Sequence, residues 1–332
     1  MYDHYIAVDW AQRNMAIARM THDSNQVKVI DVPSNIKELQ FYLSQLKGKK
    51  ILTIEETTTS QWLYTELKPY VDEIVVCDPH HNRLLSEGPK TDKIDAEKLV
   101  RLLKANFLKP VFHTGDDFIY LRKVVSGYED VVKAGVRLKN QRAALFRAQG
   151  KDKNEQSLEH PTEKFVLEGI DKGIIAYEEE KQRYEKKIHE IYKQYKIVKS
   201  LESIPGIGEI GALKIAALVI DPKRFPTRGH FLSYCGLIML DRISGGKSYG
   251  RKKPRYCPSL KSVFKTAAFS VLLPNNDSLL KEYYYFLTKE KNYNERSARN
   301  AIARRVATLA YGVLKTEKEF DPRRIKCSHI SK

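Results

Sequence analysis

The order of the predicted elements in the amino-terminal third of the chain limits the fold more than any other feature. Three short segments rich in β-branched or apolar residues, 5–9, 15–21 and 26–32, follow one another as strands. Helical and strand-like patterns then alternate. They predict helices over 36–46 and 61–67, strands over 51–54 and 73–77, and a last helix that contains Asp95. We therefore expect an α/β domain in this part of the chain.

Four acidic residues stand at the ends of these elements. In the ribonuclease-H fold, which has this element order, the first and fourth strands are neighbours. Asp9 ends the first strand and Glu55 ends the fourth, so both would lie at one edge of the sheet. Asp92 and Asp95 are three residues apart on a helix that packs against that edge, and such residues share one helix face. Glu56 remains an alternative to Glu55, because the strand is apolar on both faces and alternation does not decide between them.

Four carboxylates that converge in a basic chain indicate a bound divalent cation. Carboxylate oxygens are hard ligands of the kind that Mg²⁺ prefers. Two such ions about 4 Å apart can activate a nucleophile and stabilise a leaving oxygen during phosphodiester cleavage. In the alternative, structural interpretation, Asp92 caps its helix and Asp95 stabilises the first turn. Asp9 and Glu55 are then solvated strand ends.

The charge balance indicates the class of partner. The chain has 332 residues, with 58 Lys and Arg against 41 Asp and Glu, a net charge of +17 and a pI near 9.5. Such an excess favours a polyanion, and nucleic acid is the commonest one. A membrane partner is disfavoured, because the sequence has no long basic amphipathic helix and the apolar run 212–220 is too short to span a bilayer.

Cysteine usage and the amino terminus predict the compartment. Met1 is followed almost directly by a strand, and we expect no signal peptide. The four cysteines show no CxxC spacing, so we expect reduced thiols in a cytosolic protein, with no zinc site and no disulfide framework. They are Cys77, Cys235, Cys257 and Cys327.

Long helical patterns fill the region from Phe118 to Ser200, interrupted by the polar stretch 149–161. In the second helix, apolar and aromatic residues recur at spacings of seven, four, three and four, which is typical of a coiled-coil seam. These residues are Tyr177, Tyr184, Ile188, Ile191 and Tyr195. A plain helical hairpin within one chain is the alternative.

The segment from Ser203 to Ala212 reads Ser-Ile-Pro-Gly-Ile-Gly-Glu-Ile-Gly-Ala and opens an apolar helix. It predicts a helix-hairpin-helix, in which Gly206 and Gly208 let backbone N–H groups approach a phosphate closely. Such a motif would contact the DNA backbone and read no sequence. The alternative is an ordinary turn between two helices.

A basic stretch with a serine and two glycines follows. Ser244 is followed by Gly245 and Gly246, a permissive backbone that a bulky phosphodiester could approach. Positive side chains suited to phosphates surround it: Arg242, Lys247, Arg251, Lys252, Lys253 and Arg255. Without further information, an ordinary turn on a solvated basic face explains the same residues.

Three amino-terminal motifs resemble the DEDD motifs of one class of bacterial and archaeal insertion-sequence transposases. They are Val8-Asp9, Ile54-Glu55-x-Thr57 and Lys90-Thr91-Asp92-x-x-Asp95-Ala96. The amino-terminal domain of this class is RuvC-like, that is, similar to the Holliday-junction resolvase. The class includes DNA invertases of the pilin-gene type and recombinases guided by a bridge RNA. The resemblance implies that Asp9, Glu55, Asp92 and Asp95 bind Mg²⁺, or Mn²⁺ in its place.

A fourth motif resembles the carboxy-terminal domain of the same class. Gly236-Leu237 is followed, after six residues, by Ser244-Gly245. In the resembling domain this serine attacks DNA, which implies that Ser244 is the nucleophile and forms a transient phosphoserine link. A serine hydroxyl needs a base or a metal to activate it. We therefore expect a composite site that combines Ser244 with the acidic cluster, assembled between subunits.

The chain departs from the resembling class after this serine. Gly246 and Lys247 stand where further serines often follow, and the segment 255–259 matches the usual pattern rich in Arg, Ser, Lys and Gly poorly. Ser248 and Ser259 therefore remain alternatives to Ser244.

These observations predict three parts. Residues 1–113 form a RuvC-like catalytic domain, 114–200 a helical coiled-coil linker that supports oligomerisation, and 201–332 a mostly α-helical domain with the helix-hairpin-helix and the serine. The predicted function is a transposase that cleaves and rejoins double-stranded DNA as a homodimer or homotetramer. The resemblance also implies a structured guide RNA and a cytoplasmic location on nucleoid DNA.

Four other functions compete with this one. A junction resolvase would use the acids and water, without a covalent serine intermediate. An invertase would act on DNA sites alone, and a non-enzymatic binder would keep the acids as structural groups. A tyrosine recombinase fits poorly, because the HxxR string at 80–83 lies in the acidic domain, outside the expected helical context.

Overall fold

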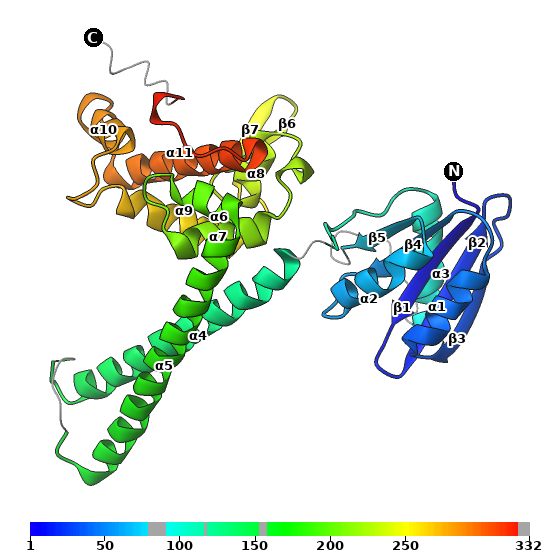
Figure 1. The fold of residues 1–332 in the computed structure, drawn as a ribbon, viewed down its shortest axis with the longest axis horizontal. Coiled ribbons are helices and arrows are strands. Elements are labelled where there is room, and N and C mark those ends of the chain that lie inside the picture. The colour runs from blue at the N-terminus through cyan, green and yellow to red at the C-terminus, as the bar shows by residue number, and fades with distance from the viewer. Residues whose placement is uncertain (79–90, 116–117, 153–157, 325–332) are drawn as a thin grey trace. The chain divides into compact units, whose positions relative to one another are not determined.

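The computed structural model describes residues 1–78, 91–115, 118–152 and 158–324. The chain divides into two compact units, Met1–Asp116 and Asp117–Lys332 (Figure 1). Several residues singled out above lie outside the described residues: Lys90 of the third motif, the HxxR string at 80–83 and Cys327.

A five-stranded mixed sheet forms the centre of the first unit, with the strand order β3-β2-β1-β4-β5. β1 runs antiparallel to β2 and parallel to β4, and β4 runs parallel to β5. This order is that of a ribonuclease-H-like fold, as the element order predicts. The elements are β1 (His4–Trp10), β2 (Asn14–Thr21), β3 (Lys28–Pro33), α1 (Ile36–Gln45), β4 (Lys50–Glu55), α2 (Ser60–Leu67), a short 3₁₀ turn (Lys68–Tyr70), β5 (Glu73–Cys77) and α3 (Asp92–Lys104).

Helices cover both faces of this sheet (Figure 1). The large side chains Ile6 and Val8 of β1 pack in one core with residues of α1 and α2. The other face carries small residues, among them Ala7 of β1, and packs against Ala96 of α3. Because alanine leaves little bulk between helix and sheet, α3 packs close to β1 and β2. This close packing sets the position of the first turn of α3 at the sheet.

Two long helices begin the second unit, α4 (Phe118–Ala148) and α5 (Pro161–Gln194), and they pack along each other within the chain. Two glycines of α4 face tyrosines of α5: Gly127 lies against Tyr184 and Gly135 against Tyr177. The seam that predicts a coiled coil is therefore occupied within the chain, as the helical-hairpin alternative predicts.

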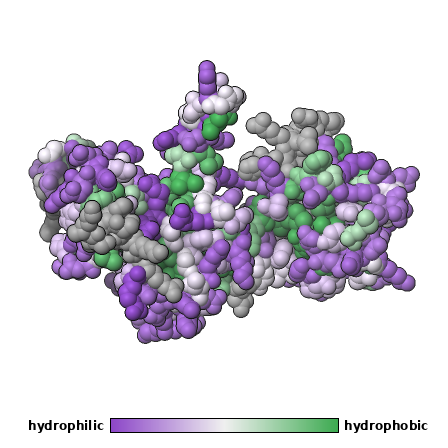
Figure 2. All heavy atoms as spheres, turned by 90° about the horizontal axis from the view of Figure 1, so that it is seen from above, coloured by the Kyte–Doolittle hydropathy of each residue, from purple (hydrophilic) through white to green (hydrophobic). Residues whose placement is uncertain are grey.

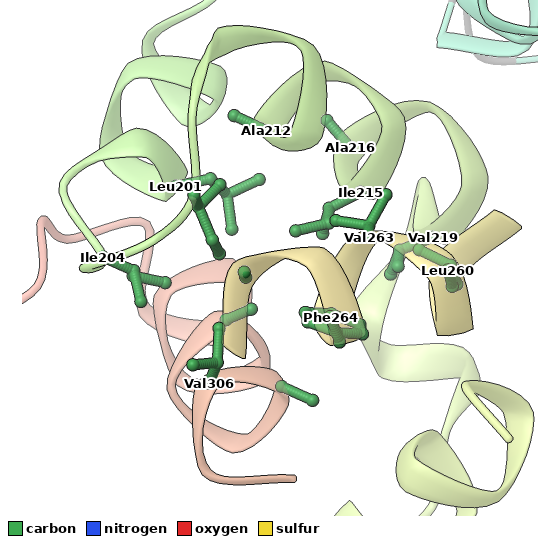
Figure 3. Packing of buried hydrophobic residues seen from close by; sticks show 14 of the residues in the cluster. Leu201, Ile204, Ala212, Ile215, Ala216, Val219, Leu260, Val263, Phe264 and Val306 are labelled. Carbon is green, nitrogen blue, oxygen red and sulfur yellow. The ribbon is translucent and has the colours of Figure 1, made fainter. Parts of the chain in front are cut away.

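A single apolar core holds the rest of the second unit together. Phe264 of α9 lies within it, among Leu201, Ile215 and Val306 from three other helices (Figure 3). The elements are α6 (Lys196–Glu202), α7 (Glu209–Val219), a 3₁₀ turn (Pro222–Arg224), α8 (Arg228–Tyr234), β6 (Leu240–Ser244), β7 (Lys247–Lys252), α9 (Pro258–Ser270), α10 (Leu279–Tyr285), a π turn (Phe286–Glu290), α11 (Glu295–Thr316) and a 3₁₀ turn (Pro322–Arg324).

This core also includes residues of α4 and α5, such as Val125 and Ile188, so the helical pair belongs to the same compact unit as the helices that follow. The division of the sequence into three parts stays a prediction. Among the described helices, none combines the length and the apolar character that crossing a membrane requires.

The glycines of the helical pair give a test of this packing. A Cβ added at Gly135 would stand 2.3 Å from a ring carbon of Tyr177, whereas one added at Gly169 would meet nothing within 4 Å. Gly→Ala inside a helix gains about 1 kcal/mol, and overpacking costs about 1–3 kcal/mol. We expect Gly169→Ala to raise the melting temperature by about 2–4 °C and Gly135→Ala to lower it by up to about 8 °C. Equal stabilisation by both substitutions, in thermal melts followed by circular dichroism, would contradict this packing.

Candidate active site

The pairing of β1 with β4 brings Asp9 and Glu55 to the same edge of the sheet. The two strands are parallel, and Val8 pairs with Ile54, so the next residue of each strand ends its strand at the same level. Asp9 has the side-chain direction of Ala7, and Glu55 has that of Ile51, because side chains alternate along a strand. Ala7 and Ile51 both belong to the core beneath α3. Both carboxylates therefore lie on the face that α3 covers.

The same alternation separates Glu55 from Glu56. Glu55 is half-buried at the end of β4, whereas Glu56 is exposed in the loop that follows, and its backbone N–H donates to the carbonyl of Cys77. The apolar residues on both faces of β4 hide this alternation in the sequence, so the sequence alone does not show which of the two glutamates lies on the α3 face.

The start of α3 presents Asp92 and Asp95. The residue that caps this helix is Thr91, whose side chain accepts a hydrogen bond from the backbone N–H of Ile94 at 3.3 Å. The alternative interpretation of Asp92 as the cap is therefore wrong. Asp92 and Asp95 occupy the first turn, where the helix dipole favours negative charge. Their carboxylates are thus available for a second role.

The electrostatics of Asp9 report on all four acids. Burial, and next the negative charges of Asp92, Glu55 and Asp95, together raise the pKa of the Asp9 carboxyl to about 6. Like charges raise the pKa of a carboxyl in this way when they lie close to it in a poorly solvated place. The four predicted residues therefore converge on one region at the edge of the sheet.

Asp95 adds a buried oxygen that accepts no hydrogen bond in the described residues. This atom is Oδ1, and the Lys98 ammonium is 3.9 Å away from it. A buried acceptor without a donor costs free energy unless something else satisfies it. A cation at this place would do so.

The residues fit a hard divalent cation in their chemistry, because all four donors are carboxylates. In their present rotamers, no three His, Cys, Asp or Glu side chains of residues 1–78, 91–115, 118–152 and 158–324 are arranged to hold one ion. Binding of an ion therefore requires the carboxylate side chains to turn toward one another. A bound cation would then relieve the repulsion between Asp9 and the other three carboxylates.

Ser244 lies in the second unit, at the tip of a two-stranded hairpin that the sequence did not predict. It ends β6 and pairs with Lys247, the first residue of β7. Gly245 and Gly246 form the turn between them with φ angles of 55° and 75°. Two left-handed residues in a two-residue turn match the twist of a hairpin, and glycine adopts this conformation most easily. The serine and both strands are exposed.

The six basic residues predicted around Ser244 all lie on or just after this hairpin and are exposed. Asp241 and Arg251 form a cross-strand pair in which Arg251 Nε lies 3.1 Å from Asp241 Oδ1. Arg251 therefore has a role in holding the strands together. The dipeptide Gly-Gly between Ile243-Ser244 and Lys247-Ser248-Tyr249 was the sequence signal for the hairpin.

The base of the hairpin is fixed to the core. Gly236 has a φ of 66°, and a Cβ there would stand 2.5 Å from the ring of Tyr256, so the glycine lets this ring pack against the backbone. The backbone N–H of Cys257 donates to the carbonyl of Tyr234 at 2.8 Å. The two ends of the serine-bearing segment therefore meet, and the hairpin extends from a defined base.

The two alternative serines differ in environment. Ser248 is exposed on β7, opposite Ile243. Ser259, near the start of α9, is half-buried and donates a hydrogen bond of 2.7 Å to Glu129, whose carboxylate also pairs with Lys214 at 3.0 Å. Ser259 therefore takes part in a contact between α4, α7 and α9, whereas Ser244 and Ser248 are open to a large substrate.

Gly206 and Gly208 stand in the turn between α6 and α7. Gly206 has a φ of 88°, and a Cβ there would stand 2.4 Å from the carbonyl oxygen of Ala267 in α9. This glycine is therefore required by helix packing. Gly208 precedes α7 and has open space beside its Cα. Both line a cavity of 1140 Å³ that Lys133 and Lys214 also line.

Comparison with known proteins agrees with the fold, which is consistent with the class of ribonuclease-H-like DEDD transposases. Residues 6–148 match the DEDD transposase family model of the IS110 type, and residues 198–285 match the model described as "Transposase IS116/IS110/IS902 family". These models cover parts of both units. The chain belongs to this IS110-type family of transposases.

One curated relative is the "Insertion element IS110 uncharacterized 43.6 kDa protein" of Streptomyces coelicolor. It is 27% identical over 120 residues, which is 36% of this chain and 29% of the relative. The matched part thus spans less than a third of the length of that protein.

The raised pKa of Asp9 gives a test of the acidic cluster. An acid whose pKa rises on folding, here from 3.8 to about 6, destabilises the folded protein once it ionises. We expect Asp9→Asn to raise the melting temperature of the protein in EDTA. The gain should be small at pH 4, grow as the pH rises to 6, and then stay constant.

Asp23→Asn is the matched control for this test, because the side chain of Asp23 is 96% exposed. The melting temperature of this variant should equal that of the wild type at every pH. Mg²⁺ should raise the melting temperature of the wild type more than that of Asp9→Asn. A gain for Asp9→Asn that is independent of pH would contradict the cluster.

Proposed function

We propose that this protein is a DNA transposase that cleaves and rejoins DNA, with a divalent ion held by Asp9, Glu55, Asp92 and Asp95 and with Ser244 as nucleophile. The observation that carries the proposal is the shared electrostatic environment of the four carboxylates at one edge of the sheet. A ribonuclease-H-like sheet and two transposase family matches support it.

The chemistry assigned to Ser244 is a transesterification. Its Oγ attacks a DNA phosphorus, its proton is lost, and one phosphodiester bond to DNA is exchanged for a bond to serine with release of a DNA hydroxyl. Because the number of phosphodiester bonds is unchanged, attack by a second DNA hydroxyl can rejoin the strand without an energy source. Mg²⁺ held by the four carboxylates would supply charge stabilisation at the reacting phosphate and activate the hydroxyl.

The exposed basic hairpin is the proposed DNA contact beside Ser244. Four cations flank the serine along the two strands and the residue after them: Arg242, Lys247, Lys252 and Lys253. Lys and Arg at this density suit the phosphate backbone. We further assign a backbone contact to the turn with Gly206 and Gly208 as a helix-hairpin-helix, where the open side of Gly208 leaves room for a phosphate.

We also propose a homo-oligomer that forms through the α4–α5 pair. Large apolar side chains remain exposed along these helices: Val136 at 50%, Phe165 at 76%, Val166 at 44% and Ile175 at 60%. Figure 2 shows hydrophilic residues over much of the face that it draws. Large exposed apolar side chains on one helical pair are typical of a surface that a partner covers. A second copy of the helical pair would cover them.

A structured bridge RNA is the proposed guide for target choice. The resemblance to RNA-guided recombinases and the net charge of +17 support an additional polyanion. An invertase that acts on DNA sites alone is the second candidate within the same class. Protein purified with a bound, structured RNA favours the guided transposase, and full activity after ribonuclease treatment favours the invertase.

The serine nucleophile is tested by trapping a covalent protein–DNA adduct on denaturing gels. We expect the wild type to form the adduct with labelled DNA and Mg²⁺, and Ser244→Ala to lose it completely. Ser248→Ala is the matched control, since Ser248 is equally exposed on the adjacent strand, and it should keep the adduct. Intact cleavage by Ser244→Ala without adduct in any variant would favour the metal-dependent nuclease with water as nucleophile.

Salt dependence tests the basic hairpin. Each phosphate contact contributes about 0.9 to the slope of log affinity against log salt, so replacing both Lys252 and Lys253 with Ala should reduce the slope by about two. Lys47 and Lys49 are a matched control, because they are exposed and precede β4 at the sheet edge opposite the acids. Fluorescence anisotropy across a few-fold range of salt measures the slopes, and equal slopes for both double variants would contradict the assignment.

A further inference from the structure

An aromatic pair lies at the same sheet edge as the acids, and the proposed function does not use it. Trp10 ends β1 directly after Asp9, and Trp62 lies in the first turn of α2. Their rings meet edge to face, with centroids 5.5 Å apart and an interplanar angle of 77°. These are the two tryptophans of the chain.

The two tryptophans differ in burial. Trp10 is half-buried and packs against the core beneath α1 and α2, whereas Trp62 leaves 43% of its surface exposed. Edge-to-face contact with a ring that is fixed in the core holds Trp62 in one orientation. The pair therefore presents a rigid aromatic surface to the solvent.

The position of the pair follows from strand geometry. Trp10 and Asp9 are consecutive, so their Cα atoms are about 3.8 Å apart and their side chains point to opposite faces of the sheet. Trp62 follows Glu55 by one short loop, at the same edge. At this edge, the acids therefore lie on one face of the sheet and the tryptophans lie on the other.

We propose that Trp62, supported by Trp10, stacks on an unpaired nucleobase of the DNA next to the phosphate that a divalent ion on the four acids would bind. This proposal rests on the proposed function, because it places a DNA strand across the edge that carries the acids. Base–aromatic stacking is strong and tolerates any base. In a duplex, neighbouring base pairs cover the base faces, so stacking on a tryptophan selects a base that has left the helix.

The position and the shape of the surface favour this occupant over a protein partner. The tryptophans lie at the sheet edge where the proposed function places a DNA strand, and the exposed ring of Trp62 offers a small flat apolar face that suits a nucleobase. An unpaired base near the cleaved phosphate would mark the strand for cleavage and hold it during the exchange. Trp62 is thus a positioning and specificity residue, which acts without contacting the reacting atoms.

Tryptophan fluorescence of the full-length protein tests the proposal without labels, because both tryptophans belong to this surface. Three DNA duplexes are compared in EDTA, where no cleavage occurs: one with a single unpaired base, the same duplex with an abasic site in place of that base, and a fully paired one. We expect the unpaired base to quench the emission and the other two to leave it nearly unchanged. Quenching that is equal for all three would overturn the proposal.

Variants extend this test to affinity. Trp62→Ala should bind the duplex with the unpaired base about 5- to 150-fold more weakly, as expected for the loss of one stacked base. Trp62→Phe should restore most of the affinity, and Phe41→Ala, which removes a 67% exposed aromatic residue from α1, should have no effect. Binding of the paired duplex should not change in any of these variants.

The outcomes separate this inference from the proposed function. Salt-dependent binding of all three duplexes without selective quenching, and with unchanged affinity in Trp62→Ala, overturns the base-stacking role and leaves the transposase proposal intact. Absence of binding to any duplex at low salt would contradict both. If Trp62→Ala fails to fold, the quenching of the wild type by the unpaired base alone decides the question.

Discussion

The parallel pairing of β1 with β4 is the constraint on which the rest of the proposed active site depends. It sets Val8 opposite Ile54 and thereby ends both strands at one level, with Asp9 and Glu55 as the next side chains on the α3 face. A shift of one residue in either strand would turn one carboxylate to the opposite face. The buried apolar residues on both faces of β4 fix this register, so the packing of the core also positions the acids.

The close approach of α3 completes the site and also lowers the stability of the folded protein. Alanines beneath the helix let its first turn reach the sheet edge, where Asp92 and Asp95 raise the pKa of Asp9. Thr91 caps the helix, so neither aspartate is needed for that purpose. Like charges held together in this way oppose folding, which is expected when function, and not stability, selects the residues. A bound cation is the simplest means of relieving the repulsion.

Sequence reasoning predicted the first unit well, because its strands and helices are short, regular and separated by clear turns. The strands around Asp9 and Glu55 were found within one or two residues, and the mixed sheet followed from their order. Alternation failed between Glu55 and Glu56, since a strand buried on both faces carries no alternating pattern. The hairpin of Ser244 was missed because its strands are polar and exposed. Their sequence therefore shows neither the hydrophobic period of a helix nor that of a strand. The sequence did not show whether the apolar seam of α5 packs on another chain or on a helix of the same chain, because the same heptad pattern is expected in both cases.

The proposed metal centre consists of carboxylates from three separate segments of the chain. Diffraction from crystals soaked in Mn²⁺, with data collected at the manganese absorption edge, tests it most directly. We expect anomalous peaks among the carboxylates of Asp9, Glu55, Asp92 and Asp95, and their loss in crystals of Asp9→Asn. Manganese bound only elsewhere in the wild-type protein, with these four side chains unliganded, would contradict it.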